Sequence, residues 1–192
     1  MIKTGIFGGS FDPIHKGHIA LARTILQKMG LEEVWFVVSP HNPLKEQQNL
    51  TDDNVRLKMV RLALSDYSRL VASDYEFYLP RPSYMWNTLV HIQADFPDRK
   101  LFLIIGEDNW DCFDQWYHHE DILKNFNVIV YPRNAEQTIT RRSNKQVRFI
   151  RTRLLPVSST MVRERVRKGE PINDLVPSKI VDFIEKNHLY QR

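Results

Sequence analysis

One stretch of sequence decides the fold: Gly8-Gly9-Ser10-Phe11-Asp12-Pro13-Ile14-His15-Lys16-Gly17-His18. A short apolar run at residues 6–7 precedes it and predicts the first strand of a sheet. Residues 19–26 follow with the apolar spacing of a helix packed on that sheet. The glycine pair lets the backbone approach a ligand closely, because no Cβ intervenes. Unpaired N–H groups and the positive dipole end favour an anion at the helix start, so the stretch predicts a phosphate site.

Two histidines flank the glycine at the predicted helix entrance. His15 and His18 lie on either side of Gly17, where both imidazoles are expected to donate hydrogen bonds to phosphate oxygens. An ordinary turn and a zinc site are the alternatives. Zinc is the weaker one, because no HExxH pattern surrounds the histidines and Cys112 is the only cysteine. The complete pattern at a first strand–helix junction favours the phosphate site.

The composition fits one globular domain over residues 1–192. The chain is 42% hydrophobic and 26% charged, which is enough to build a core. A single cysteine excludes an internal disulfide and suits a reducing compartment. The longest apolar runs are too short to span a bilayer, and a strand that begins almost at Met1 leaves no room for a signal peptide. We therefore expect a cytoplasmic location and no membrane partner.

The net charge of +4 is a mild basic bias that suits phosphorylated partners. Basic residues crowd the segment 133–168, but Phe149 is the only aromatic side chain among them. A nucleic-acid surface usually interleaves aromatic and basic side chains. The pattern therefore favours phosphate handling and an ordinary solvated surface over nucleic-acid binding. The sequence does not determine the oligomeric state, and a homo-oligomer is one alternative.

Short apolar runs alternate with amphipathic segments along the chain. This alternation predicts an α/β fold, with a Rossmann-like open parallel sheet and helices on both faces. The expected strands are residues 34–38, 70–73, 101–105 and 127–131, and the expected helices are residues 51–64, 83–94 and a last one opened by Pro177. Thr51 and Ser83 are the expected N-caps. Ligands bind such sheets at the carboxyl ends of the strands.

Several polar or aromatic residues follow these strand ends. Lys45 lies in a proline-rich loop, where it is either solvated or close to a phosphate. Asp108 is either an acceptor for ribose hydroxyls or a helix N-cap. Trp116, expected on a helix that also holds Trp110 and Phe113, is either core or a stacking platform. Arg56 is either a surface charge or faces the site, and on its own the surface is favoured.

A second anion cradle is predicted near the end of the chain. Ser158, Ser159 and Thr160 lie at a helix start, and Arg163 follows one turn later. Hydroxyls, helix N–H groups and a guanidinium together suit a phosphate. The alternative is a simple capping box.

The order of these motifs resembles the bacterial-type nicotinate-nucleotide adenylyltransferases, which are HxGH nucleotidyltransferases. The resemblance runs from the first strand to Leu189-Tyr190. The matching motifs are Gly8–His18, Arg81-Pro82-Ser83-Tyr84, Gly106-Glu107-Asp108 with Trp116, Tyr131-Pro132-Arg133 and Ser158-Ser159-Thr160-Met161-Val162-Arg163. It implies transfer of the AMP part of ATP to nicotinate mononucleotide, with Mg²⁺, giving nicotinate adenine dinucleotide and pyrophosphate.

The resemblance also implies a role for each site residue. His15 and His18 would be catalytic contacts to the ATP phosphates. ATP would be bound by Gly8, Gly9, Ser10, Phe11, Gly17, Gly106, Asp108, Ser158, Ser159, Thr160 and Arg163. The mononucleotide would be bound by Lys45, Tyr84, Met85, Trp116, Tyr117 and Arg133, with Trp116 stacked on the pyridine ring and backbone groups near Met85 and Tyr117 at its carboxylate.

One motif departs from the family pattern. The family commonly carries Ser-Tyr-Thr-x-Asp-Thr-Leu, where residues 83–89 read Ser-Tyr-Met-Trp-Asn-Thr-Leu. Met85 removes a hydroxyl near the expected carboxylate pocket, and Asn87 removes a negative charge. Alternatives are therefore a sister adenylyltransferase for nicotinamide mononucleotide or phosphopantetheine, or a non-catalytic nucleotide-binding protein. The intact His15, Gly17 and His18 argue against a non-catalytic protein.

Overall fold

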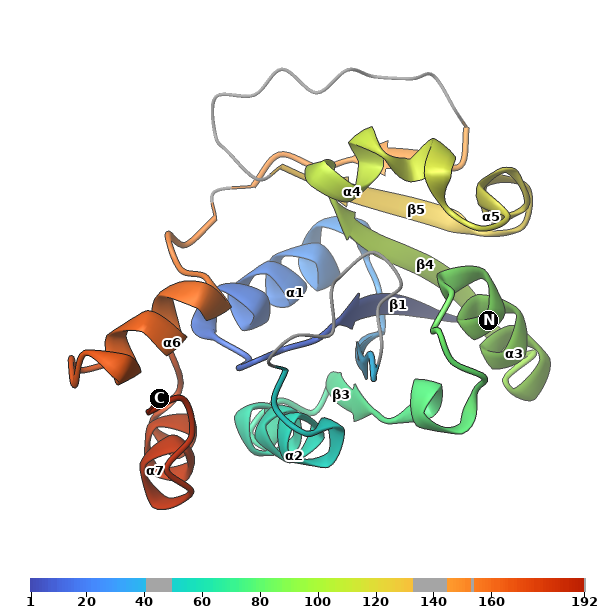
Figure 1. Ribbon diagram of the computed structural model, residues 1–192. Coiled ribbons are helices and arrows are strands. Elements are labelled where there is room, and N and C mark those ends of the chain that lie inside the picture. The colour runs from blue at the N-terminus through green and yellow to red at the C-terminus, as the bar shows by residue number, and fades with distance from the viewer. Residues whose placement is uncertain (41–49, 133–144, 153, 192) are drawn as a thin grey trace.

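Six parallel strands form one open sheet in the computed structural model, which describes residues 1–40, 50–132, 145–152 and 154–191 (Figure 1). The strands are β1 (Ile2–Gly9), β2 (Glu33–Val38), β3 (Leu70–Ser73), β4 (Arg99–Gly106), β5 (Asn127–Tyr131) and β6 (Val147–Phe149). Their order is β3-β2-β1-β4-β5-β6, and every neighbouring pair is parallel. The predicted α/β fold with a parallel sheet is confirmed.

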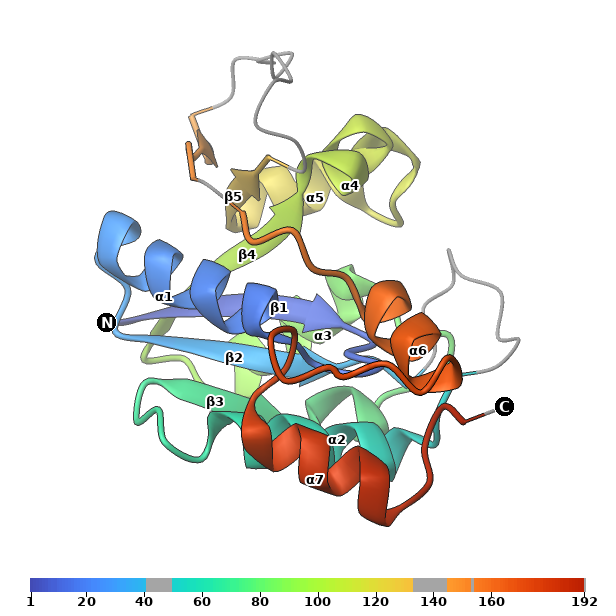
Figure 2. The same cartoon turned by 90° about the vertical axis from the view of Figure 1, so that its left-hand side faces the viewer.

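Helices cover both faces of this sheet (Figures 1 and 2). One face packs against α1 (Lys16–Met29), α2 (Asp53–Leu64), α6 (Ser159–Arg167) and α7 (Ser178–Lys186). The other packs against α3 (Met85–Asp95), α4 (Glu107–Asp111) and α5 (His119–Asn125). Two 3₁₀ turns, η1 (Tyr75–Tyr78) and η2 (Phe113–Gln115), complete the described elements. Among the helices of these described ranges, none is long and apolar enough to cross a membrane.

The strand order reverses beside β1, and this reversal places the site. The chain passes from β1 to β2 and β3 on one side, then returns to β4 on the other side of β1. Gly5 pairs with Val34 of β2 and with Phe102 of β4, so β1 is central. The loops after β1 and β4 therefore leave the sheet in different directions. A crevice forms between such loops at the carboxyl edge of an open parallel sheet.

Two predicted helix caps are wrong. Asp52, not Thr51, caps α2, and its Oδ1 accepts from the N–H groups of Asn54 at 2.9 Å and Val55 at 3.3 Å. The Thr51 N–H instead donates to Asp12 Oδ2 at 3.2 Å, so Thr51 lies outside the helix. Tyr84, not Ser83, is the N-cap residue of α3, and it caps through its backbone only.

The predicted helix after β4 is also wrong in extent. It divides into α4 and η2, because Cys112 leaves the helical conformation between them. Trp110 lies on α4 and Phe113 on η2, where both are buried. Trp116 follows η2 in an extended conformation, so it is not part of a helix.

Arg56 is buried rather than at the surface, which corrects the prediction. Its side chain is 0% exposed, and its Nη1 donates to the carbonyls of Ser10 at 2.6 Å and Ser39 at 2.9 Å. Its Nε donates to the carbonyl of Thr51 at 2.8 Å, and its Nη2 pairs with Asp53 at 2.5 Å. The planar guanidinium carries enough donors to satisfy all of these acceptors at once. It thereby joins the ends of β1 and β2 to the start of α2.

Replacing Arg56 is therefore expected to destabilise the fold. Arg56→Met leaves buried carbonyls and Asp53 without a donor, and should lower the free energy of unfolding by about 3–5 kcal/mol. The matched control is Arg61→Met on the same helix, because Arg61 is 58% exposed and pairs with Asp74 at 3.0 Å. Loss of that surface pair should cost less than about 1 kcal/mol. Urea unfolding measures both variants, and equal effects would contradict the buried role.

Candidate functional site

A cavity of about 780 Å³ opens at the carboxyl edge of the sheet, beside the ends of β1 and β4. All of the described residues that the sequence predicts for the site line it: Gly8, Gly9, Ser10, Phe11, His15, Gly17, His18, Tyr84, Met85, Gly106, Asp108, Trp116, Tyr117, Ser158, Ser159, Thr160 and Arg163. Lys45 and Arg133 lie outside the described residues. The sequence therefore predicted which segments share one cavity, although they come from opposite ends of the chain.

The two histidines hold one another at the start of α1. His15 is the N-cap residue, and its Nδ1 accepts from the His18 N–H at 3.3 Å. His18 Nδ1 accepts in return from the His15 N–H at 3.2 Å, which completes a capping box. Each Nδ1 is used as an acceptor, so the proton of each neutral ring lies on Nε2. Each ring can therefore act as an Nε2–H donor.

The two imidazole rings are also stacked. Their centroids lie 3.6 Å apart, and the planes differ by 17°. Phe11 meets the His18 ring edge-on at a centroid distance of 5.1 Å, and His15 is buried. These contacts fix the ring orientations, so the two Nε2 donors have defined directions.

Gly17 allows the second cradle to approach the first. A Cβ at this position would lie 2.8 Å from Cγ1 of Val157 and 3.0 Å from Nδ1 of His15. Val157 directly precedes Ser158, the N-cap residue of α6. A glycine is therefore required where the start of α1 packs against the chain entering α6.

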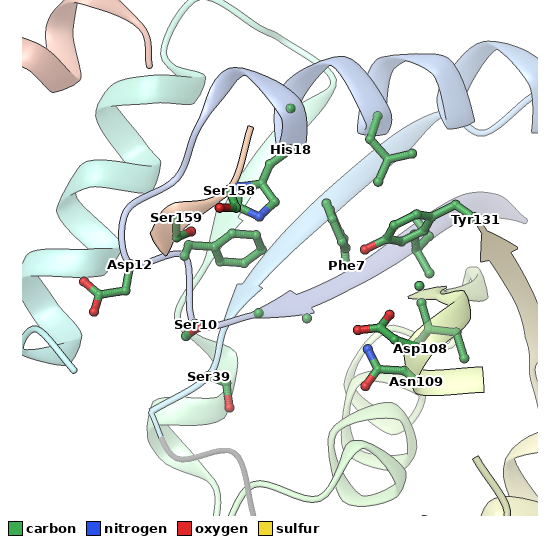
Figure 3. Close-up of a pocket in the computed structure, with 18 of the residues that line it drawn as sticks. Phe7, Ser10, Asp12, His18, Ser39, Asp108, Asn109, Tyr131, Ser158 and Ser159 are labelled. Carbon is green, nitrogen blue, oxygen red and sulfur yellow. The ribbon is translucent and has the colours of Figure 1, made fainter. Parts of the chain in front are cut away.

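The hydroxyl cluster at the start of α6 is hydrogen-bonded to the signature loop, the segment of residues 10–15 between β1 and α1. Ser158 Oγ caps the helix by accepting from the Met161 N–H at 3.1 Å, so the capping alternative is confirmed for this serine. Ser159 Oγ donates to the carbonyl of Pro13 at 2.9 Å. Ser158 and Ser159 lie beside His18 in Figure 3. The N-termini of α1 and α6 thus meet at one end of the cavity, where positive dipole ends favour an anion.

Arg163 lies one turn into α6 and faces the same loop. Its Nη1 donates to the carbonyl of Asp12 at 2.6 Å, and its Nη2 donates to Thr160 Oγ1 at 3.3 Å. The guanidinium therefore brings a positive charge to the cradle and also supports the loop backbone.

Asp12 is a buried anchor that the sequence analysis did not assign. Its Oδ1 accepts from the hydroxyl of Tyr190 at 2.6 Å, and its carboxylate points away from the other labelled side chains in Figure 3. Burial, and then the Asp12 charge, raise the pKa of the Tyr190 hydroxyl well above its ordinary value. Tyr190 therefore stays protonated and donates to Asp12. The aspartate within the signature was visible in sequence, but its partner is 178 residues away.

Asp108 lies on the opposite side of the cavity from His18 (Figure 3). Gly106 is the N-cap residue of α4, so the alternative that Asp108 is an N-cap is wrong. Its side chain is exposed and lines the cavity, and Asn109 lies beside it. A carboxylate at this place can accept hydrogen bonds from hydroxyl groups of a ligand. Asn109 was missed, although it follows the same strand end.

Aromatic side chains line the cavity near the start of α3. The rings of Tyr84 and Tyr117 lie 4.8 Å apart. Trp116 packs against Phe113 with a centroid distance of 5.2 Å and also lines the cavity, so it is both core and cavity wall. A flat aromatic ligand suits such a surface, because stacked rings attract one another.

Glu76 is a buried carboxyl that the sequence analysis missed. It is 1% exposed, and its Oε1 accepts from the hydroxyl of Thr88 on α3 at 2.8 Å. Burial raises the pKa of Glu76, and the nearby hydroxyls of Thr88, Ser39 and Ser83 oppose that shift. Ser39 directly follows β2, so the strand-end pattern could have identified it. A lone glutamate in a 3₁₀ turn gives no comparable signal.

Metal-binding side chains are not gathered in the described part of the chain. Within it, no group of three or more His, Cys, Asp or Glu residues is placed to hold a metal ion. Asp12 and Glu76, two carboxylates around the cavity, accept hydrogen bonds from protein donors.

Comparisons with known proteins identify the family of this chain. A cytidylyltransferase-like family model matches residues 6–165. Probable nicotinate-nucleotide adenylyltransferases from Flavobacterium psychrophilum and Bacteroides fragilis are similar to the chain. The first is 39% identical over all of both chains, and the second is 45% identical over 88% of this chain and 85% of its own. A solved nicotinic acid mononucleotide adenylyltransferase from Plasmodium falciparum, complexed with NaAD, has the same fold, with a TM-score of 0.82, 21% identity and coverage of 99% and 98%. The chain therefore belongs to the nicotinate-nucleotide adenylyltransferases, within the cytidylyltransferase-like family.

Proposed function

We propose that the protein transfers the adenylyl group of ATP to nicotinate mononucleotide, forming nicotinate adenine dinucleotide and pyrophosphate. One observation carries the proposal: a single cavity joins two helix N-termini, both suited to phosphate, to an aromatic wall. A reaction between two phosphorylated substrates that both carry an aromatic ring needs this combination. The names of the relatives support the same activity.

The reaction needs no covalent intermediate on the protein. A phosphate oxygen of the mononucleotide is itself a competent nucleophile at neutral pH. It forms a bond to the α-phosphorus of ATP while the bond from that phosphorus to the β-phosphate oxygen breaks, and pyrophosphate leaves. Cys112 is no candidate nucleophile, because its thiol is turned back toward the carbonyls of Asp108 and Asn109 on its own helix. Catalysis then consists of alignment and stabilisation of charge on the leaving group.

The two helix starts would share the phosphate charge. The Nε2–H groups of His15 and His18 would donate to the oxygens that gain charge as pyrophosphate departs. The start of α6, with Thr160 and Arg163, would hold the far end of the triphosphate. Asp108, across the cavity, would accept from ribose hydroxyls. Mg²⁺ bound with ATP would neutralise phosphate charge.

The aromatic side of the cavity would hold the mononucleotide. Trp116 would stack on the pyridine ring, beside Tyr84 and Tyr117. The carboxylate of the ring would accept from backbone N–H groups at Met85, the first residue of α3, and near Tyr117. A backbone contact does not depend on the hydroxyl that Met85 lacks.

Removal of the His18 ring should reduce turnover far more than stability. His18→Ala is expected to lower kcat by about two orders of magnitude, as the loss of one preorganised donor does. Loss of its part in the capping box should lower the free energy of unfolding by only about 1 kcal/mol. His91→Ala is the control, because His91 is exposed on α3 and bonds to the carbonyl of Asn87 at 2.7 Å. Near-normal kcat in folded His18→Ala would refute the assignment.

Removal of the Arg163 guanidinium should separate the two substrates. Arg163→Ala is expected to raise KM for ATP more than KM for the mononucleotide, since the start of α6 is assigned to the triphosphate. The control is Arg165→Ala on the same helix, where Arg165 pairs with Asp174 at 2.8 Å. Steady-state kinetics with each substrate varied in turn gives both values. An equal rise in both would show that Arg163 acts only through the Asp12 loop.

Substrate choice should favour the acid over the amide. The NH₂ group of nicotinamide would face N–H donors and leave them unpaired, at about 1–3 kcal/mol for each buried group. Lost attraction between the carboxylate and the helix dipole adds to this difference. We expect kcat/KM for nicotinate mononucleotide to exceed that for nicotinamide mononucleotide by at least about a hundredfold.

Pyrophosphate release from ATP with a panel of mononucleotides tests both the activity and this preference. Comparable rates with the acid and the amide would overturn the acid-specific reading. No release with any member of the panel would overturn the proposed function itself.

A further inference from the structure

The space beside Gly8 is filled by a side chain of the protein. A Cβ at Gly8 would lie 2.7 Å from Cε of Met85, so the methyl end of Met85 rests on the Gly8 backbone. The neighbouring Gly9 is covered in the same way, because a Cβ there would lie 2.9 Å from the Phe11 ring. The sequence predicted that this glycine pair leaves room for a ligand. In this chain, protein atoms occupy the Cβ side of both glycines, and both glycines still line the cavity.

Met85 connects two parts of the cavity that have different chemistry. Its backbone begins α3, directly after Tyr84, whose ring lies 4.8 Å from that of Tyr117. Its side chain ends on Gly8, close to the end of β1, where the signature loop begins. Met85 lines the cavity between these points and packs against the core under α3. The threonine that the family commonly carries here ends at its γ atoms, two atoms short of Cε.

We propose that Met85 is a specificity-determining residue of the mononucleotide pocket, with the Gly8 backbone as its seat. Its thioether forms the wall between the aromatic pocket and the phosphate loop and sets the room available to the pyridine mononucleotide. This inference rests on the proposed function for the identity of the ligand.

The Met85 side chain would discriminate between ligands by steric fit. The thioether is apolar and a weak acceptor, so it offers a ligand contact area but no strong hydrogen bond. One methylene of misfit in an apolar pocket changes discrimination by about 10- to 200-fold. Met85 has rotatable bonds that let its end move, and core side chains pack behind it. A group added at Gly8 would therefore push the methyl end into the cavity, against the mononucleotide.

The decisive experiment adds a Cβ at Gly8 with and without the methionine. Gly8→Ala should raise KM for nicotinate mononucleotide by about tenfold or more, and by a larger factor than it raises KM for ATP. In a Met85→Ala background the same change should raise KM for the mononucleotide by less than about threefold, because the clash has gone. An equal penalty in both backgrounds, or a rise mainly in KM for ATP, would show that Gly8 makes room for ATP and would overturn the proposal.

Enlarging the pocket gives a second test that does not need Gly8→Ala to fold. Met85→Ala should raise the kcat/KM of a ring-methylated nicotinate mononucleotide, relative to the unmodified one, by at least about tenfold. Met85→Leu keeps the side-chain volume and should change this ratio by less than about threefold. An unchanged ratio in Met85→Ala would place the wall elsewhere and refute the role.

The contact itself can be tested without substrate. Gly8→Ala should lower the midpoint of thermal unfolding in the presence of Met85 and lower it less in the Met85→Ala background. If that coupling is present while wild-type protein releases no pyrophosphate, the proposed function fails and the packing of Met85 on Gly8 stands. If wild-type protein is active and neither coupling nor altered selectivity appears, the inference about Met85 fails alone.

Discussion

The guanidinium of Arg56 fixes the loops from which the site is built. It has no exposed surface, and its acceptors are carbonyls that follow β1 and β2 together with Asp53 at the start of α2. Asp53 also pairs with Arg81, at 3.0 Å, before α3. A buried charge of this kind is tolerated only when its donors are used and its charge is balanced. The carboxyl edge of the sheet therefore cannot rearrange in one loop alone without leaving this ion unsatisfied.

The backbone of the signature loop is held by side chains from distant helices. The carbonyls of Ser10, Asp12 and Pro13 accept from Arg56, Arg163 and Ser159, which belong to α2 and α6. A carbonyl that points at a protein donor repels an incoming phosphate less. The loop backbone is thus held by helices far away in sequence, while the helix starts present their N–H groups. Phe11 adopts a left-handed φ of 47°, a conformation that such surroundings can impose on a residue other than glycine.

Sequence patterns were most informative where local and periodic signals agree. Apolar runs located β2 and β4, and the shared carboxyl edge then brought Trp116, Asp108 and the serine cluster to one cavity. The burial of Arg56 was not predictable in this way, because most of its acceptors are backbone carbonyls, up to 46 residues away, which no side-chain pattern marks. Thr51 and Asp52 are both favoured N-cap residues, so only the backbone geometry decides which of them caps α2. Lys45 and Arg133 lie outside the described residues, so their roles stay predictions.

The bond between Tyr190 and Asp12 bears on how the protein is made. Asp12 emerges early during synthesis, but the hydroxyl that binds its carboxylate is encoded 178 residues later. At roughly 5–20 residues per second, that interval is on the order of ten seconds or more. A nascent chain can form the sheet in this time, yet the loop that holds Asp12 lacks one anchor until Tyr190, which follows α7, has left the ribosome. Adenylyl-transfer competence is then expected to depend on synthesis of the segment that carries Tyr190.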